Sequence, residues 1–189
     1  MAGGTWWASE LKLELSQGDV AANVPGSALV HPLTYLNPRP AKGGQSVYEP
    51  SGAPFSKPGK KGDERQFMLG SGEVAGALVL SYDCEIDKAG KPNNPILIAP
   101  VFAIGSLPTE SQIAVLEQRR FSLMPLPDVP QLGTSYADFR LIQAVRRAYL
   151  PLDVRLASMN IDAVDRLQAQ LVAFLTRRTF TGRVEPDNL

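Results

Sequence analysis

VAGALVLSYDCEID, at residues 74–87, is the stretch that decides the fold of this chain. Its segment from Ala77 to Leu80 is a continuous apolar run, which is typical of a β-strand covered on both faces. Polar side chains follow directly after this run. We expect them at one rim of a sheet, where rigid strands position binding and catalytic groups. They are Ser81, Asp83, Cys84, Glu85 and Asp87.

The neighbouring sequence predicts further strands. Residues 90–94 have the composition of a hairpin turn, and the apolar residues 95–104 are predicted to return as its partner strand. Leucines alternate with charged residues over 11–15, which predicts a half-buried strand ending in the turn 17–19. Residues 121–126 also have strand character, and the prolines in and after them favour the edge of a sheet.

Two segments have the pattern of helices. Residues 110–118 are predicted to form a short helix capped by Thr109, with Ile113 and Leu116 as its buried positions. A longer helix is predicted over 161–177, because Asn160 is a good N-cap and apolar residues recur at helical spacing. The residues expected on its buried face are Val164, Leu167, Leu171 and Leu175.

Prolines and glycines dominate residues 36–64, so we expect few regular elements there and interpret the segment as a long loop. The chain is therefore predicted to form one domain over 1–180, with 36–64 inserted and 181–189 as a polar tail. The best local basic patch falls in and beside the loop. Its members are Lys57, Lys60, Lys61 and Arg65.

Composition limits the function classes. The 189 residues are 44% hydrophobic and 20% charged, with 19 basic and 19 acidic residues, so no global field draws the chain to nucleic acid. A single cysteine excludes an internal disulfide and a cysteine-rich zinc site. No apolar run approaches the roughly 20 residues of a membrane span, and the first residues lack the pattern of a secretory signal. We expect a location in the cytoplasm, or in a virion if the protein comes from a phage.

GALVLSYDCEI, at residues 76–86, resembles the strand-and-turn signature of uncharacterised bacterial and phage proteins related to PemK/MazF-like SH3-type barrels. Residues 17–25, 135–140 and 155–159 resemble other segments of the same group. The resemblance implies a mainly β (α+β) fold, which is a small, strongly bent β-barrel with a long Pro/Gly loop and a C-terminal helix. The positions that match the family motif are Ser81, Asp83, Cys84, Glu85 and Asp138.

The resemblance leaves ribonuclease activity open, because one fold hosts many functions. MazF-type ribonucleases carry an Arg-Pro pair ahead of the equivalent strand, where this chain has Ala75 and Gly76. Arg65 and Ser81 would have to replace the groups that handle the scissile phosphate. The acidic turn would repel an incoming phosphodiester, which disfavours this activity.

The turn also allows two other chemical interpretations. Cys84 is a candidate nucleophile, but its acidic neighbours disfavour the thiolate, so a buried structural thiol is expected. Asp83, Glu85 and Asp87 are candidate ligands for a divalent cation, together with Asp138. Their spacing does not match an EF-hand loop, so a solvated acidic turn is preferred and neither a metal nor another cofactor is expected.

Trp6 and Trp7 are the last notable pair. Two consecutive residues of a strand point to opposite faces, so one ring is expected to be exposed unless a partner covers it. With no evident catalytic constellation, the sequence favours a non-catalytic protein-interaction or structural component, with a protein partner or a homo-oligomer. The interaction candidates are Trp6, Trp7, Lys57, Lys60 and Lys61. The ribonuclease and the metal-dependent enzyme are the alternatives, and nucleic acid would bind only through the basic loop.

Overall fold

The computed structural model describes residues 5–28, 34–40, 46–51, 67–69, 71–86 and 94–176. It describes the side chains of these residues too, except within 26–74 and at Glu85. The chain divides into two compact units, Met1–Gly26 with Val74–Leu189, and Ser27–Glu73. Each unit has its own sheet.

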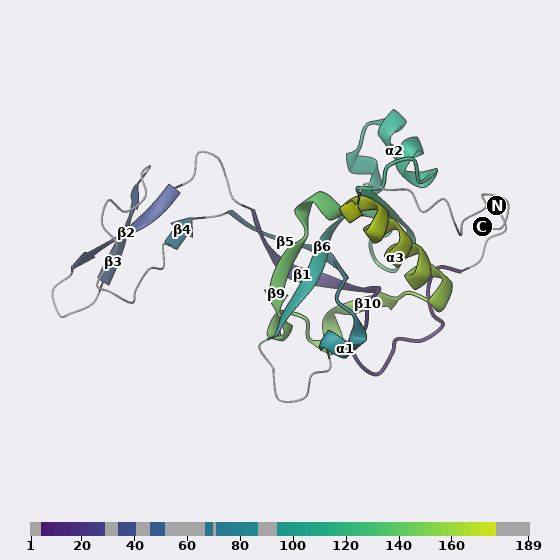
Figure 1. The fold of residues 1–189 in the computed structure, drawn as a ribbon, viewed down its shortest axis with the longest axis horizontal. Helices are drawn as coiled ribbons and strands as arrows, with labels where there is room; N and C mark the ends of the chain where they lie inside the picture. Colours follow the sequence, from purple (N-terminus) through teal and green to yellow (C-terminus); the bar gives the residue numbers. More distant parts are fainter. Residues whose placement is uncertain are drawn as a thin grey trace. The chain divides into compact units, whose positions relative to one another are not determined.

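The larger unit is built on a curled antiparallel half-barrel sheet (Figure 1). Its strand order is β10-β1-β5-β6-β8-β7, and β9 pairs with a separate stretch of β6. The strands are β1 (Asp19–Ala28), β5 (Ser71–Val79), β6 (Pro95–Ala103), β7 (Leu123–Val129), β8 (Gly133–Asp138), β9 (Gln143–Arg146) and β10 (Arg155–Ser158). The α-helices are α1 (Asp83–Ile86), α2 (Thr109–Leu116) and α3 (Ile161–Thr176). This confirms a mainly β fold with a C-terminal helix.

The central pair of strands, β5 and β6, is buried on both faces. Its antiparallel register places Leu78 opposite Ala99 and Val79 opposite Ile98. The first pair belongs to one hydrophobic cluster and the second pair to another, because successive side chains of a strand point to opposite faces. The prediction of a strand covered on both sides, followed by a returning partner, is therefore confirmed.

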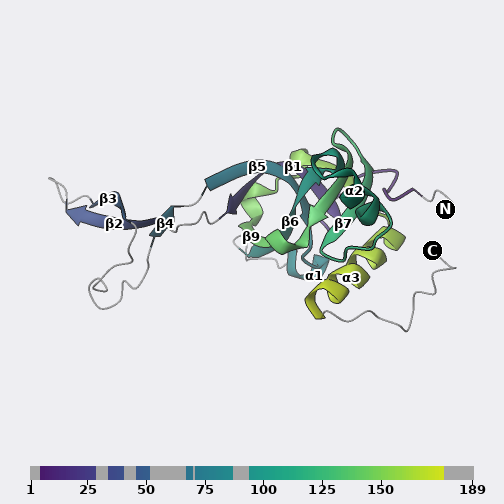
Figure 2. The ribbon, with the colours of Figure 1, turned by 90° about the horizontal axis from the view of Figure 1, so that it is seen from above.

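Helix α3 covers one face of the sheet and lies along its side in Figures 1 and 2. Asn160 caps it, since its Oδ1 accepts a hydrogen bond of 2.9 Å from the backbone N–H of Ala163. Leu167 is fully buried, and Val164 and Leu171 pack against the same cluster as predicted. Leu175, expected on this face, is exposed one turn further on.

The strand predicted over 11–15 does not form. Leu11 and Leu13 are exposed, and only Leu15 enters the core. The guanidinium of Arg155 donates hydrogen bonds to the carbonyls of Lys12 and Glu14, at 2.7 and 2.8 Å. A buried side chain therefore takes the place of a neighbouring strand, and the segment stays irregular.

Helix α2 forms where predicted, but its orientation differs from the prediction. The buried positions are Ala114 and Val115, whereas Ile113 and Leu116 are 47% and 46% exposed. The residue at the N-cap position is Pro108, which provides no side-chain capping bond. The apolar pattern of this helix is nearly uniform around its axis, so periodicity alone could not choose the buried face.

The smaller unit contains a three-stranded sheet in the order β3-β2-β4. Its strands are β2 (Thr34–Pro40), β3 (Ser46–Ser51) and β4 (Phe67–Leu69). Pro38 and Pro40 pair with β3 and lie beyond Leu36, where the described pairing of β2 with β4 ends. A proline, which has no N–H, fits a strand position that has no described ladder on one side. The interpretation of 36–64 as a long loop with few regular elements is therefore wrong for the part of β2 after Tyr35 and for β3.

The edge position predicted for the proline-containing strand is confirmed, since β7 ends the strand order of the larger sheet. No described helix is long and apolar enough to cross a membrane.

Candidate functional site

The polar cluster predicted after the central strand lies at the end of β5, where the chain enters the short helix α1. Ser81 is buried, and its Oγ accepts a hydrogen bond of 2.9 Å from the backbone N–H of Leu97 in β6. The β5–β6 ladder ends at Val79, and this side-chain hydrogen bond continues the contact between the two segments beyond it. The hydroxyl is therefore used to hold the rim of the sheet together.

Asp83 and Gln17 join α1 to the turn that precedes β1. The Oδ1 of Asp83 accepts a hydrogen bond of 2.7 Å from the backbone N–H of Gln17. The side chain of Gln17 donates to the carbonyl of Leu80 at 2.7 Å and accepts from Gln168 of α3 at 2.8 Å. Amide side chains thus connect three elements that lie far apart in the sequence.

Cys84 is a free thiol and is exposed, so the expectation of a buried structural cysteine is wrong. The helix turn at Asp83–Ile86 directs Ile86 toward the core, where it packs with Leu15 and Val79 among others. Since one turn of helix can bury only one side, Cys84 remains on the solvent side.

A groove of about 590 Å³ lies between α1, the N-terminal segment and the start of α3. Its interior combines amide groups with a thiol and aliphatic side chains. The lining residues are Ala8, Lys12, Gln17, Tyr82, Asp83, Cys84, Met159, Asn160, Ile161, Val164 and Gln168.

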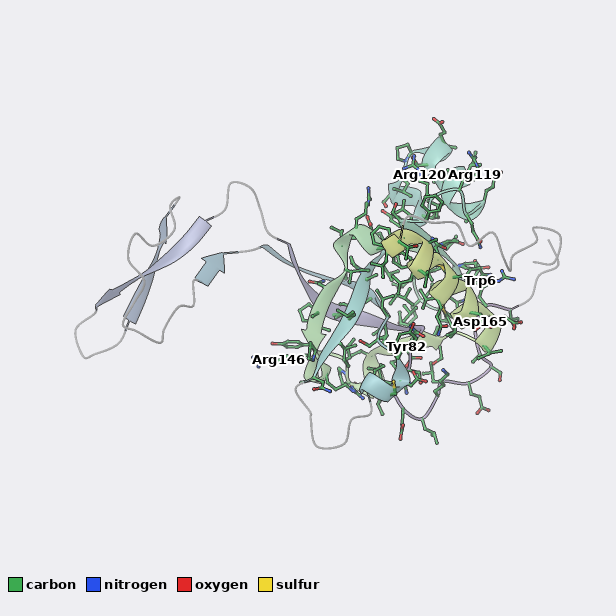
Figure 3. All side chains as sticks on the ribbon, in the orientation of Figure 1. Trp6, Tyr82, Arg119, Arg120, Arg146 and Asp165 are labelled. Atoms are coloured by element: carbon green, nitrogen blue, oxygen red, sulfur yellow. The ribbon has the colours of Figure 1, made fainter. Side chains whose placement is uncertain are left out.

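Large apolar side chains stand exposed around this groove. Ile161 is 74% exposed and Tyr82 is 52% exposed, and both line it. Figure 3 shows Tyr82 beside α1. Exposed apolar side chains that line a groove are typical of a surface that contacts another molecule.

The carboxylate of Asp138 is paired with Arg140. Its carboxylate accepts hydrogen bonds from the backbone N–H of Arg140 at 2.9 Å and from the Arg140 guanidinium at 2.6 Å. The hydrogen bond to Asp138 raises the pKa of Arg140 above its ordinary value. Within the described part of the chain, no three His, Cys, Asp or Glu side chains gather as a metal-binding group.

Trp6 and Trp7 both pack, partly buried, against the cluster beneath α3, so the expectation of one uncovered ring is wrong. Trp7 forms a backbone bridge with Met159, next to β10, and its indole N–H donates to the carbonyl of Pro127 in β7 at 2.8 Å. Because β10 and β7 are the two ends of the strand order, Trp7 links both edges of the curled sheet. The guanidinium of Arg166 lies 5.4 Å from the Trp6 ring centre.

Several predicted site residues fall outside the described residues. The basic candidates are Lys57, Lys60, Lys61 and Arg65, and the acidic one is Asp87. The Glu85 side chain is likewise outside the description, although its backbone belongs to α1.

Sequence reasoning missed a buried ion pair beside the site. Arg155 of β10 contacts Asp19 of β1 at 3.1 Å, and both side chains are almost fully buried. Asp19 also accepts a hydrogen bond of 2.9 Å from the backbone N–H of Ser16. The sequence pattern places Asp19 only in the turn 17–19, and nothing in the sequence indicates that a residue 136 positions later compensates its charge.

The groove-lining residues Gln17, Asn160, Ile161 and Gln168 were also missed as a group. Neutral amides and a single aliphatic residue carry no chemical motif, so only their spatial assembly reveals them. No protein-family model and no curated protein matches this chain.

Proposed function

We propose that this protein is a non-catalytic interaction component that binds a partner protein in the groove between α1 and α3. The observation that carries the proposal is the exposure of Tyr82 and Ile161, which both line that groove. Covering such side chains removes apolar surface from water, at about 25 cal/mol for each Å² buried. The complementary partner presents apolar side chains that cover Tyr82 and Ile161.

The proposal includes an SH3/MazF-like barrel as the scaffold and a structural role in an assembly such as a phage particle. The link that Trp7 makes between β10 and β7 supports a closed barrel, because it joins the two ends of the sheet. A rigid scaffold of this kind supports binding at its rim.

The ribonuclease alternative gains no support from the described residues. Ser81 is buried and its hydroxyl is bound to the Leu97 backbone, so it presents no free group to a phosphate. The alternative is tested by incubating the protein with mixed RNA, with Arg65→Ala as the control. Cleavage that disappears in the variant would replace the interaction proposal.

The interaction proposal is tested by affinity capture with the immobilised protein, followed by reconstitution with each purified candidate partner. The double variant Tyr82→Ser/Ile161→Ser removes the exposed apolar groups that line the groove, and neither residue belongs to a buried core cluster. Leu152→Ser is the matched control, because Leu152 is also exposed but does not line the groove. We expect the purified partner to bind the wild type and the control, with at least about tenfold weaker binding to the double variant. Equal binding to all three proteins would overturn the proposal.

A further inference from the structure

Helix α2 is apolar on two opposite sides. Ala114 and Val115 face the fold, and Val115 packs in a cluster with Leu123 and Tyr136. On the other side, Ile113 and Leu116 are about half exposed. The four consecutive residues 113–116 make the last turn of α2 apolar all round its axis. An apolar turn normally has both sides covered, so the outer side of this turn lacks a contact that its composition favours.

Residues of opposite charge precede and follow this apolar turn along the chain. Glu110 lies in the first turn of α2, and Arg119 and Arg120 follow its last turn, as Figure 3 shows for the two arginines. Arg119 is engaged by Glu117 at 2.7 Å. Glu110 and Arg120 make no ion pair with any described residue. The α2 patch, defined as Ile113 and Leu116 between Glu110 and Arg120, therefore has a negative end and a positive end.

We propose that the α2 patch binds a second copy of this chain, with the two α2 helices antiparallel about a twofold axis. In this arrangement the Ile113 side chain of each copy packs against Leu116 of the other. The twofold axis also brings the Glu110 end of each helix to the Arg120 end of the other. The patch is thus complementary to itself in charge as well as in apolar character, which is the requirement of an isologous interface.

The dimer is weak and depends on concentration. An eight-residue helix is about 12 Å long, which is short compared with the roughly 800 Å² per partner of a standard stable interface. Salt weakens the dimer, because the flanking charges are exposed to solvent. This inference concerns α2 and does not depend on the groove between α1 and α3.

The decisive experiment is light scattering of the purified full chain over a wide concentration range. We expect the mass to rise from 20.4 kDa toward twice that value as concentration increases. Ile113→Glu places a charge in the apolar contact twice per dimer, so we expect the dimer Kd to rise at least about tenfold. Leu141→Glu is the matched control, since Leu141 is similarly exposed but lies outside α2, and it should leave the Kd unchanged.

A charge swap tests the antiparallel geometry. Glu110→Arg alone and Arg120→Glu alone should each weaken the dimer, because each places like charges together. The double variant Glu110→Arg/Arg120→Glu should restore the Kd to within about threefold of the wild type, with the salt dependence retained. Circular dichroism and Tm of each variant verify that the fold is intact, and Leu116→Ser provides a milder second disruption.

Three outcomes would overturn the inference. One is a mass of 20.4 kDa at every concentration. Another is a dimer that Ile113→Glu and Leu116→Ser leave unchanged. The third is a double charge variant that remains as weak as the single variants, which would exclude the antiparallel pairing.

Discussion

Helices α3 and α2 lie in the same unit, yet they use their apolar residues differently. The sixteen residues of α3 have one apolar stripe, which the core buries through Ala163 and Leu167. The eight residues of α2 bury Ala114 and Val115 and leave larger apolar side chains outside. An amphipathic pattern therefore identifies the buried face, whereas a short helix without an apolar stripe is oriented by what it packs against.

The sharpest test of this contrast is truncation of one leucine in each helix. Leu167→Ala removes a fully buried side chain of α3, and we expect it to lower the free energy of unfolding by about 2–5 kcal/mol. Leu116→Ala of α2 should lower it by less than about 1 kcal/mol, because that side chain is already half in water. Urea denaturation of dilute protein measures both. Equal losses would show that the outer side of α2 is covered within one chain.

The second test uses glycines near each helix. Gly18 has a φ of +84°, and a Cβ there would lie 2.9 Å from the Cβ of Met159 and 3.1 Å from Cγ2 of Val164 in α3. We expect Gly18→Ala to cost about 2 kcal/mol or more. Gly105, which lies before α2, has no atom within 4 Å of the corresponding Cβ, so Gly105→Ala should change stability by less than about 1 kcal/mol. Tm shifts compare the two, and a tolerated Gly18→Ala would contradict the tight packing of α3.

The third test concerns the helix starts. Asn160→Ala removes the capping bond of α3 to Ala163, and we expect a loss of about 1 kcal/mol. Pro108→Ser adds a possible capping group to α2, where none is present, and should raise stability by up to about 1 kcal/mol. Denaturant midpoints measure the two shifts. Shifts of the same sign would show that capping does not distinguish the helices.

The smallest effects are expected from charges on the two helices. Arg166→Gln removes the contact over the Trp6 ring and should cost about 0.5–1 kcal/mol. Arg119→Gln removes an ion pair with Glu117 in which both side chains are more than half exposed, so its cost should be close to zero and vanish in salt. Repeating both measurements at low and high salt separates them, and a large salt-resistant effect at Arg119 would contradict its exposure.

The sequence predicted the elements whose local signals agree with one another. The β5–β6 pair was found because a continuous apolar run and a turn signal coincide, and α3 was found because its cap and its stripe coincide. The strand predicted over 11–15 was wrong. Apolar and charged residues do alternate there, but backbone carbonyls of the segment accept hydrogen bonds from Arg155 and not from a neighbouring strand. The polar rim after β5 was located correctly, but the groove beside it was not predicted, because its other walls come from residues 8–17 and 159–168.

By itself, the sequence determined a β-rich chain with a central buried strand and a capped helix near residues 161–176, because short-range patterns of polarity encode those features. Only the tertiary structure decided that Cys84 is exposed, that Trp7 links β10 to β7, and that Ile113 and Leu116 face outward. These properties depend on which distant segments meet. Contacts between distant segments follow from the packing of the whole core, which no local pattern of residues records.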